Sequence, residues 1–390
     1  MTCKKAFALV ALAALAVTFV SWCSAPRQDD PSQASAAPSV ADSAPRPVLP
    51  VRLLFAGDMM QHGPQLRAAY DSVRKTYDYS PYFQHIGKLS KEADVAVCNL
   101  EVTLRGKPYS GYPQFSSPDE YFKAIAAAGY DVFLTANNHC LDCGRKGLER
   151  TIAKLRDSGL AQIGTYEDSL DRALRYPAVM EVNGHRLSFL NYTYGTNGLK
   201  PTAGNVVNYI DTAVIAADVV KARSLGAEFV IACVHWGVEN VFEPNQAQRR
   251  LAKWLIEKGV DHVIGGHPHV VQPAEVITTP DGRRHLVVYS LGNVISNMKN
   301  RGNDGGMLLG MTIGSENYND AADGAWWVAF HAPKPRFSGL KNYTAFPAGF
   351  PASKMPASEV KALNDFVQDA RRVMAKGDSI TEKNYENWGW

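Results

Sequence analysis

The fold of this chain is decided by the stretch VRLLFAGD, residues 51–58. Its apolar part, residues 51–56, predicts a short buried strand. Gly57 then makes a tight turn that places the carboxylate of Asp58 at the end of this strand. A strand that is apolar along nearly its whole length is typical of a sheet covered on both faces.

The same pattern recurs at four places further along the chain. Short apolar strands are predicted at 93–98, 131–135, 229–234 and 262–264, and each is followed by polar side chains. Amphipathic helices are predicted between strands, at 119–128, 147–158, 210–224 and 246–258. Alternating strands and helices predict an α/β fold, and in open α/β sheets ligands bind beyond the carboxyl ends of the strands.

The polar residues at these strand ends form a candidate metal site. Taken singly each has a plainer explanation, because Asp58 would cap a helix, Glu101 would be a surface charge and a lone histidine is usually just hydrogen bonded. Their occurrence together at five strand ends is what indicates a site. Oxygen and imidazole donors suit manganese, iron or zinc without choosing among them. The set consists of Asp58, Glu101, Asn138, His139, His235, His267 and His269.

Asp142 extends this set because it lies three residues after His139. At that helical spacing a carboxylate can orient the imidazole and stabilise its charged form. In the alternative interpretation a helix begins here, with Asn138 as its cap and Asp142 complementing its dipole, and both roles can coexist. A pair of metal ions brackets the attacking and leaving oxygens of an in-line displacement, so phosphate ester hydrolysis is the natural chemistry.

The N-terminus predicts export. Two lysines precede an apolar run, residues 6–20, which is typical of a secretory signal peptide and is shorter than the roughly 20 residues that a spanning helix needs. We assign residues 1–23 to this peptide. Val20-Ser21-Trp22-Cys23 resembles a bacterial lipobox, so Cys23 is the predicted lipid attachment site and a membrane anchor. Trp22 departs from that pattern, and ordinary cleavage after Ala25 remains the alternative.

The rest of the chain divides by composition. Residues 24–50 are rich in Pro, Ala, Ser, Gln and Asp, which predicts a disordered linker. Residues 51–315 are expected to form the main domain, and residues 316–390 an extension that packs on it. In this extension we predict an edge strand at 326–330, a loop at 333–356 and a helix at 358–375.

The charge distribution bears on possible binding partners, and the cysteine content bears on disulfide formation. The net charge of +3 is scattered without a basic stripe, so nucleic acid is not expected as a partner. Cys98, Cys140, Cys143 and Cys233 are too sparse for a disulfide scaffold. Free thiols are the favoured interpretation, with a Cys140–Cys143 disulfide as the alternative in an oxidising compartment. The oligomeric state is not defined by the sequence.

At this point the chain resembles a known family, the CapA-type bacterial capsule or poly-γ-glutamate synthesis proteins, a branch of the calcineurin-like metallophosphoesterases. The similar segments follow the order of the family and cover roughly residues 51–313. They are AGDMM (56 to 60), CNLEVTL (98 to 104), LTANNHCLDCGRKGLERT (134 to 151), VHWGVE (234 to 239), GGHPHVVQP (265 to 273) and YSLGNVISN (289 to 297).

The resemblance implies a four-layer α/β/β/α sandwich of the metallo-dependent phosphatase type with two divalent ions. Asp58 and His269 would serve one ion, and Asn138, His235 and His267 the other. Glu101 would bridge them, His139 would be the general acid, and residues 289–293 would lie near the rim. The implied protein is extracytoplasmic, acts in synthesis of an envelope polymer, and takes that polymer or a phosphate ester as its partner or substrate.

Two departures from the wider pattern favour keeping a second hypothesis. Met60 stands where those enzymes usually have the histidine of a D-x-H motif, and His62 comes two residues later. The bridging carboxylate is a glutamate instead of an aspartate. The alternative is a non-catalytic polymer- or partner-binding component of envelope assembly. Aromatic residues would line its groove, although packing in the core is the plainer role for each of Tyr109, Tyr112, Phe115, Tyr194 and Trp236.

Overall fold

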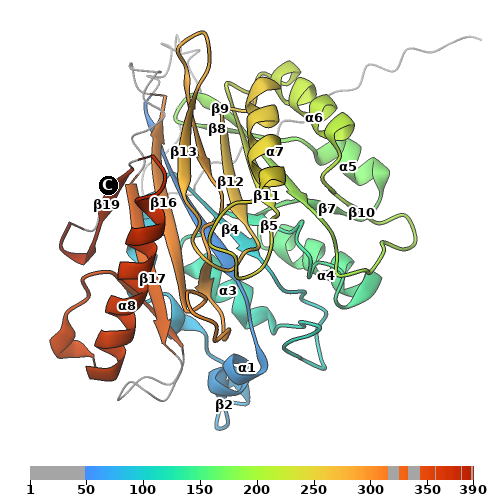
Figure 1. Ribbon diagram of the computed structural model, residues 1–390. Coiled ribbons are helices and arrows are strands. Elements are labelled where there is room, and N and C mark those ends of the chain that lie inside the picture. The colour runs from blue at the N-terminus through green and yellow to red at the C-terminus, as the bar shows by residue number, and fades with distance from the viewer. Residues whose placement is uncertain (1–48, 315–324, 333–342, 356, 379, 388–389) are drawn as a thin grey trace, which may run out of the picture. The chain divides into compact units, whose positions relative to one another are not determined.

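The computed structural model describes residues 49–314, 325–332, 343–355, 357–378, 380–387 and 390 (Figure 1). The predicted signal peptide, its Cys23 and residues 24–48 of the predicted linker lie outside this range. The last two residues of that linker are bound to the body, because Leu49 N donates to Asn183 O (3.0 Å) and Asn183 Nδ2 donates to Pro50 O (3.1 Å). No helix among the described residues is both long and apolar enough to cross a membrane.

Strand β1 (Val51–Met59) divides its side chains between two hydrophobic cores. Leu53 and Phe55 pack into one core, while Leu54 and Ala56 pack into the other. Successive side chains of a strand point to opposite faces, so both faces of β1 are covered. All four side chains are at most 4% exposed. This is the two-sided burial that the apolar run predicted.

The first sheet contains nine strands among the described residues. Their order is β18-β17-β16-β1-β4-β5-β6, with β15 beside β1 and β19 beside β17. Strands β1, β4, β5 and β6 run parallel, and β16 pairs antiparallel with β1, which places Val51 opposite Ile313. The other strands are β4 (Val95–Leu100), β5 (Val132–Leu134), β6 (Ala161–Ile163), β15 (Asn293–Ile295), β16 (Gly305–Ile313), β17 (Ala325–Ala332), β18 (Thr344–Pro347) and β19 (Thr381–Lys383).

The second sheet has six strands in the order β13-β14-β12-β11-β9-β8. Its central strands β9, β11, β12 and β14 are parallel. They are β8 (Ala178–Val182), β9 (His185–Thr193), β11 (Phe229–His235), β12 (His262–Gly266), β13 (Ala274–Thr278) and β14 (Arg284–Val288). Two further pairs of short strands are β2 (Tyr70–Asp71) with β3 (Thr76–Tyr77), and β7 (Thr165–Tyr166) with β10 (Val206–Val207).

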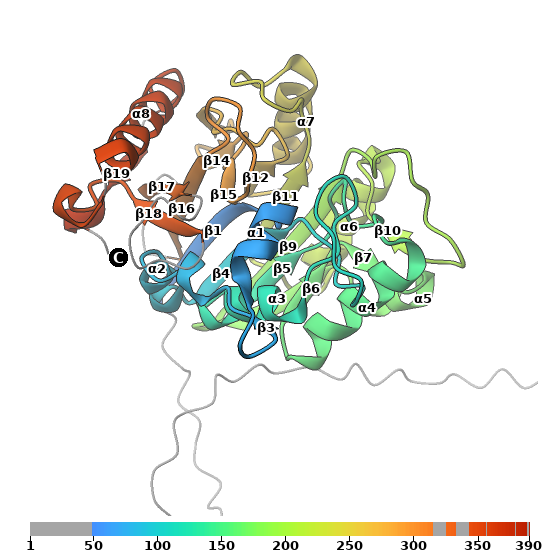
Figure 2. The same ribbon diagram turned by 90° about the horizontal axis from the view of Figure 1, so that it is seen from below.

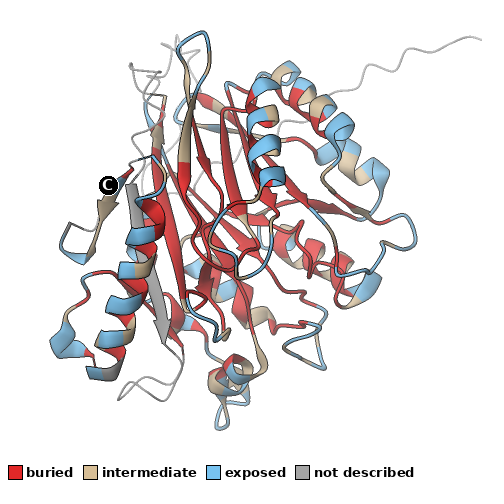
Figure 3. Ribbon diagram, viewed as in Figure 1, coloured by how far each residue is buried: buried red, intermediate tan, exposed pale blue. Residues whose placement is uncertain are grey.

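Helices cover the outer faces of the two sheets. Their bounds are α1 (Gly63–Ala69), α2 (Gly87–Glu92), α3 (Asp119–Ala127), α4 (Gly144–Asp157), α5 (Ser169–Arg175), α6 (Thr212–Ser224), α7 (Gln246–Glu257) and α8 (Ala357–Met374), with short 3₁₀ turns η1 (Ser80–Tyr82), η2 (Ala352–Lys354) and η3 (Tyr385–Asn387). Figure 3 shows that α6 and α7 turn exposed faces outward while the strands beneath them are buried.

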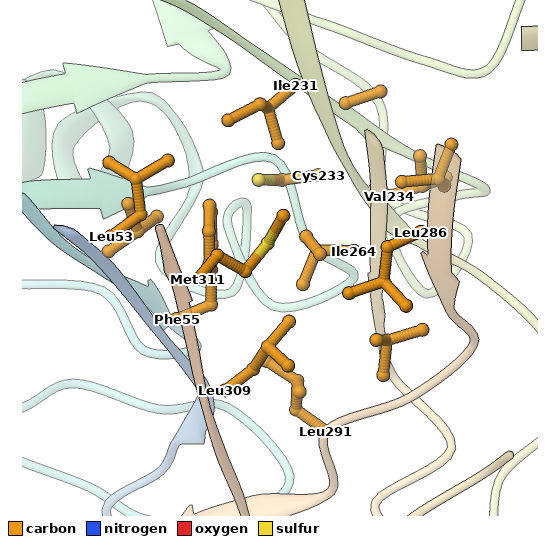
Figure 4. Packing of buried hydrophobic residues seen from close by; sticks show 14 of the residues in the cluster. Leu53, Phe55, Ile231, Cys233, Val234, Ile264, Leu286, Leu291, Leu309 and Met311 are labelled. Atoms are coloured by element: carbon orange, nitrogen blue, oxygen red, sulfur yellow. The ribbon is translucent and has the colours of Figure 1, made fainter. Parts of the chain in front are cut away.

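The sheets pack face to face and complete a four-layer α/β/β/α sandwich. Phe55 of β1 meets Phe189 of β9 with ring centroids 6.2 Å apart. Figure 4 shows Leu53, Phe55 and Met311 of the first sheet facing Ile231 and Cys233 of the second. In Figure 2 the layers follow one another as α7, β11 with β12, β1 with β4, and α3. The predicted fold class is confirmed.

Several predicted boundaries were wrong for identifiable reasons. Helix α4 begins at Gly144, not at 147, because residues 144–146 are exposed and carry no apolar period. Helix α6 begins at Thr212, two residues later than predicted, because the Asp211 carboxylate caps it by accepting from Ala213 N and Val214 N. The apolar period alone did not show either end.

The C-terminal part also differs from the prediction. Strand β17 pairs with both β16 and β18, so it is not an edge strand. Strand β18 lies within the stretch predicted as loop, where proline and glycine residues surround four buried strand residues. Helix α8 was predicted to within one residue at each end.

Gly57 allows the first strand to approach the segment before β15. A Cβ at this position would lie 2.0 Å from Gly292 O, the oxygen that accepts a hydrogen bond from Asp58 N (2.9 Å). We predict that Gly57→Ala lowers the free energy of unfolding by about 1–3 kcal/mol, because the crowded backbone must shift. Urea unfolding measures the change. Gly195→Ala is the control, since its Cβ would meet no atom within 4 Å, and equal stability of both variants would contradict the close approach.

Candidate metal centre

The carboxyl ends of strands from both sheets meet at one place. Asp58 lies within the end of β1, and β1 pairs in parallel with β4, which places Asp58 opposite Asn99. In the second sheet His235 ends β11 and pairs with Gly266 at the end of β12. The structure brings together all eight predicted side chains, each at most 6% exposed. They are Asp58, Glu101, Asn138, His139, Asp142, His235, His267 and His269.

Asp58 does not follow β1, as predicted, but belongs to it. The pairing of β1 with β4 shifts register between Ala56 and Asp58, and Asp58 then pairs with Asn293 of β15. The strand therefore continues to Met59. The irregularity matters to the site because it directs the Asp58 carboxylate toward the histidines of the second sheet.

Two groups of three side chains have the geometry to hold a cation. In each group the three ligand atoms lie within 4.8 Å of one another. One group is Glu101, His267 and His269, and the other is Asp58, Glu101 and His235. Glu101 belongs to both, which is the position of a bridging ligand. The groups divide the histidines differently from the prediction, which joined His267 to His235.

Asn138 adjoins the second group. Its Oδ1 lies 2.8 Å from His235 Nε2, and its Nδ2 donates to Asn197 Oδ1 at 3.2 Å. The Asn138 oxygen is thus directed at His235 of the candidate ligand group and not at a helix. The N-cap of α4 is Cys143, so the alternative in which Asn138 caps that helix is wrong.

The residues present fit a divalent cation. Glu101 Oε1 and His267 Nδ1 are buried side-chain atoms with no hydrogen-bond partner among the described residues. Leaving one such atom unsatisfied costs about 1–3 kcal/mol, and native proteins hold few of them. Both atoms belong to members of the same ligand group. A cation bound there would satisfy the two at once, and carboxylate with imidazole is a common donor set for manganese, iron and zinc.

The loop after β12 holds its two histidines in strained backbone conformations. The φ angle is +95° at His267 and +58° at His269, in the region that favours glycine. Such residues cost of order 1–3 kcal/mol each and persist only where their surroundings fix them. Here His267 N donates to Asp58 Oδ2 (3.4 Å), and Asn240 N donates to the intervening Pro268 O (2.8 Å). These backbone conformations place both imidazoles in the candidate site.

Asp58 and His269 form a buried ion pair. Their oxygen Oδ2 and nitrogen Nδ1 lie 3.1 Å apart. Burial would raise the pKa of Asp58, but the hydrogen bond and charge of His269 outweigh it and hold the pKa well below its usual range. Burial would lower the pKa of His269, but Asp58 reverses the effect and raises it. The histidine is therefore charged in the ion-free protein over a wider pH range than usual.

The pKa values of the other candidate ligands shift in the direction that favours their neutral forms. Burial, aided by the charge of Asp58, raises the pKa of Glu101 well above its usual range. Burial lowers the pKa of His235 well below normal and that of His267 to about 3, and neighbouring imidazoles add to both effects. His235 and His267 are thus neutral and can offer lone pairs to a cation, while the raised pKa of Glu101 makes its carboxyl group harder to ionise in the absence of a cation.

His139 and Asp142 form a dyad beside the ligand groups. His139 Nδ1 lies 2.8 Å from Asp142 Oδ2, which also accepts a hydrogen bond from Phe115 N at 2.7 Å. The Phe115 ring packs against the edge of His139 with centroids 4.6 Å apart. The two side chains are in contact, as their spacing predicted, but they lie in a turn that precedes α4 and not in the helix.

Sequence reasoning assigned no role to Asn99, Asn137 or Asn293 individually. Asn99 Nδ2 donates to Asp58 Oδ1 (2.8 Å), and Asn293 Oδ1 lies 3.1 Å from His269 Nδ1. A signal for Asn99 was available, since it lies two residues before Glu101 and such residues share a face of a strand. Asn293 fell inside the segment predicted near the rim.

Among the described residues, no nearby histidine takes the place of the one that the D-x-H motif would have at position 60. Met60 is buried in the hydrophobic core, 2% exposed. His62 precedes α1 and accepts a hydrogen bond from Asn297 N at its Nδ1 (3.2 Å). Neither residue belongs to a ligand group in the described part of the chain.

The aromatic residues divide into two kinds. Phe115 and Trp236 are buried, and Trp236 Nε1 donates to Tyr289 O at 2.9 Å, so the core role is confirmed for both. Tyr109 is half-buried. Tyr112 is 72% exposed and Tyr194 is 47% exposed. The Tyr194 ring lies over His267, with centroids 4.4 Å apart, and therefore borders the site.

The four cysteines of the body are free thiols. Cys98, Cys140 and Cys233 are buried, and burial raises the pKa of each thiol. None belongs to a metal-binding group among the described residues. The favoured interpretation of the Cys140–Cys143 pair is confirmed.

Known proteins are similar to this chain over much of its body. Residues 52–298 match the family described as "Bacterial capsule synthesis protein PGA_cap". The capsule biosynthesis protein CapA of Bacillus anthracis is 29% identical over 224 residues, which cover 55% of this chain and 53% of that protein. The PGA biosynthesis protein CapA of Bacillus subtilis (strain 168) is 28% identical over 250 residues, or 62% of each. The matched part is thus less than two thirds of each relative.

Solved structures show more distant similarity. The NAD nucleotidase of Haemophilus influenzae is 12% identical with a TM-score of 0.44, covering 86% of this chain and 64% of that one. The 5'-nucleotidase of Candida albicans SC5314 is 11% identical with a TM-score of 0.41, covering 82% and 57%.

We predict that metal binding releases protons. The pKa values of Glu101 and His269 are raised, so in the ion-free protein each group keeps its proton to a higher pH than usual, and a cation must displace such protons. Affinity should therefore rise with pH as these groups deprotonate. Calorimetric titration with Mn²⁺ in two buffers of different ionisation enthalpy measures the release. Identical heats in both buffers would show that no proton leaves.

Proposed function

Because the chain belongs to the bacterial capsule synthesis protein PGA_cap family, we propose that it acts in envelope polymer synthesis as a metal-dependent phosphoesterase. The proposal includes export by residues 1–23 and lipid anchoring at Cys23, which make the protein extracytoplasmic and membrane-tethered. It takes residues 51–315 as the catalytic domain and residues 316–390 as an extension of it.

One observation carries the proposal of metal-dependent chemistry. Two buried ligand atoms without partners, Glu101 Oε1 and His267 Nδ1, lie in a cage of neutral imidazoles and carboxylates. The His139–Asp142 dyad lies beside this cage. A structural role for these groups would leave the unsatisfied atoms and the two strained histidines without compensation.

The ligands of the proposed centre are the six residues predicted from sequence. Bound there, a divalent ion polarises a phosphoryl oxygen and stabilises the charge that develops in the transition state. Manganese, iron and zinc all suit the donors. The ligand set is Asp58, Glu101, Asn138, His235, His267 and His269.

His139 is the proposed general acid. Its Nδ1 is engaged by Asp142, and the Phe115 N–H fixes the carboxylate in turn. This leaves Nε2 as the nitrogen that gives a proton to the leaving oxygen of a phosphate ester. Asp142 orients the imidazole through this contact at Nδ1, as carboxylates do in other acid–base dyads.

A second candidate function is a non-catalytic polymer- or partner-binding component of envelope assembly. The observation that favours it is the pair of exposed aromatic side chains, Tyr112 and Tyr194, of which Tyr194 borders the metal centre. Aromatic rings with one polar end are common at binding surfaces. The two candidates differ in whether changing the His139–Asp142 dyad abolishes a reaction.

We predict that His267→Ala abolishes both metal binding and hydrolysis. The variant removes one imidazole of the only group that contains two unpartnered ligand atoms in the described part of the chain. Metal content by mass spectrometry and turnover of bis-p-nitrophenyl phosphate with added Mn²⁺ are the measurements. His85→Ala is the control, because this histidine packs on Phe346 and Phe350. Metal without turnover in the wild type would favour the binding component.

We predict that Asp142→Asn lowers turnover by about 10²–10⁴-fold, the usual contribution of a general acid. Metal content should stay at the wild-type level, because Asp142 belongs to neither ligand group. His139→Ala should cause a similar loss, and the double variant should be no slower than His139→Ala because the two residues act as a unit. Unchanged turnover in both single variants would eliminate the dyad as the acid.

A further inference from the structure

The side chain of Asn99 lies inside one of the two candidate ligand groups. Its Nδ2 is 2.8 Å from Asp58 Oδ1, 3.2 Å from Glu101 Oε2 and 3.4 Å from His235 Nδ1. Asp58, Glu101 and His235 are the three members of that group. A primary amide nitrogen therefore lies against every side chain that would hold an ion there.

Hydrogen bonds fix which end of the Asn99 amide faces these ligands. Asn137 Nδ2 donates to Leu100 O (2.9 Å), and Asn137 Oδ1 accepts from His139 N (3.2 Å). Backbone groups have a fixed donor or acceptor character, so they determine the orientation of Asn137. Asn137 Nδ2 also donates to Asn99 at 3.0 Å, which requires Asn99 Oδ1 on that side. Nδ2 of Asn99 must then face Asp58.

The amide makes the same demand on its neighbours as a cation does. An NH₂ group donates two hydrogens and needs oxygen or nitrogen lone pairs, the feature that a metal ion also requires. Its two hydrogens are directed at Asp58 and Glu101. Asn99 thus already engages one oxygen of Asp58 and one oxygen of Glu101 in this group.

The group of Glu101, His267 and His269 contains ligand atoms that no hydrogen bond in the described part of the chain engages. Glu101 Oε1 and His267 Nδ1 have no hydrogen-bond partner among the described residues. Glu101 directs Oε2 at the Asn99 amide, while its Oε1 faces both groups, 3.7 Å from His235 Nε2 and 3.8 Å from His269 Nε2. The group of Glu101, His267 and His269 thus has two ligand atoms without a partner among the described residues, whereas the Asp58 group has the Asn99 amide against all three of its members.

A second observation concerns the Asp58 side of the centre. Met60, two residues after Asp58, is apolar and buried, and His62 Nδ1 accepts from Asn297 N. Neither supplies the further donor that an ion at Asp58 needs to complete its coordination. The Asp58 group thus has a hydrogen-bond donor against its three members and gains no ligand from position 60 or 62.

We propose that Asn99 takes the place of one of the two predicted ions, so that the chain binds a single divalent ion at Glu101, His267 and His269. This inference rests on the proposed metal-dependent function. Asn99 is a positioning residue, since its two N–H groups hold the Asp58 and Glu101 carboxylates together in place of a cation. Asp58 in turn orients His269 through the ion pair at Nδ1.

Metal counting in Asn99 variants tests the inference. The purified full chain is equilibrated with Mn²⁺, freed of unbound ion by gel filtration and analysed by mass spectrometry. We expect about one ion per wild-type chain and about two in Asn99→Asp, because the new carboxylate supplies the charge that a bridged pair of ions needs. Electron paramagnetic resonance gives a second readout, since two Mn²⁺ ions that share Glu101 couple magnetically and a single ion does not.

Two further variants serve as a control and as an alternative to Asn99→Asp. Asn191→Asp makes the same change at another buried amide, which accepts from Ala136 N and donates to Cys233 O without touching a ligand, and its ion count should stay at the wild-type value. Asn99→Ala removes the amide without adding a charge, and should admit a second ion more weakly. This variant replaces Asn99→Asp if the latter fails to fold.

The outcomes separate this inference from the proposed function. Two ions in the wild type would overturn the inference and leave the metal-dependent function standing. One ion in the wild type and one in a folded Asn99 variant would also overturn it, because the amide would not be what excludes the second ion. Wild-type protein without any ion would overturn both. One ion that becomes two only in the Asn99 variants supports it.

Discussion

The site depends on the buried carboxylate of Asp58, which joins the two sheets. It accepts from Asn99 of β4 in its own sheet, and from His267 N and His269 Nδ1 in the loop that follows β12 of the other sheet. Its own N–H is held by Gly292 O. A fully buried carboxylate is stable only when its oxygens are satisfied in this way. The alignment of the two sets of strand ends, and therefore the ligand cage, follows from these bonds.

Much of the architecture could be predicted because it follows from side-chain alternation. Once residues 51–56 are read as a strand that is apolar on both faces, a layer is required on each side of it. The ends of helices and strands were harder to predict from the sequence. The start of α4 at Gly144 depends on exposed residues without a pattern, and β18 is a four-residue strand among prolines and glycines. Neither has an apolar period: α4 begins from a local turn in which Gly144 N donates to Leu141 O, and β18 exists through its pairing with β17.

The candidate site was predictable in its members and not in its geometry. Strand ends with carboxylates and imidazoles can be found in the sequence, and the structure brings all of them together. The backbone strain at His267 and His269 could not be found, because φ is set by tertiary contacts. The role of Asn99 was equally hidden, since an asparagine beside a carboxylate has many uses. Only the orientation imposed by Asn137 shows which of its atoms faces the ligands.

The pairing of Val51 with Ile313 has a consequence for how the chain reaches this state. Strand β1 carries the first ligand, yet its antiparallel neighbour β16 comes from the other end of the main domain. Contacts of such long sequence separation form slowly, because a large loop must close first. A growing or truncated chain without β16 therefore has β1 as an unprotected edge, a surface to which other strands can add. Pairing of β16 with β1 is therefore what covers this edge.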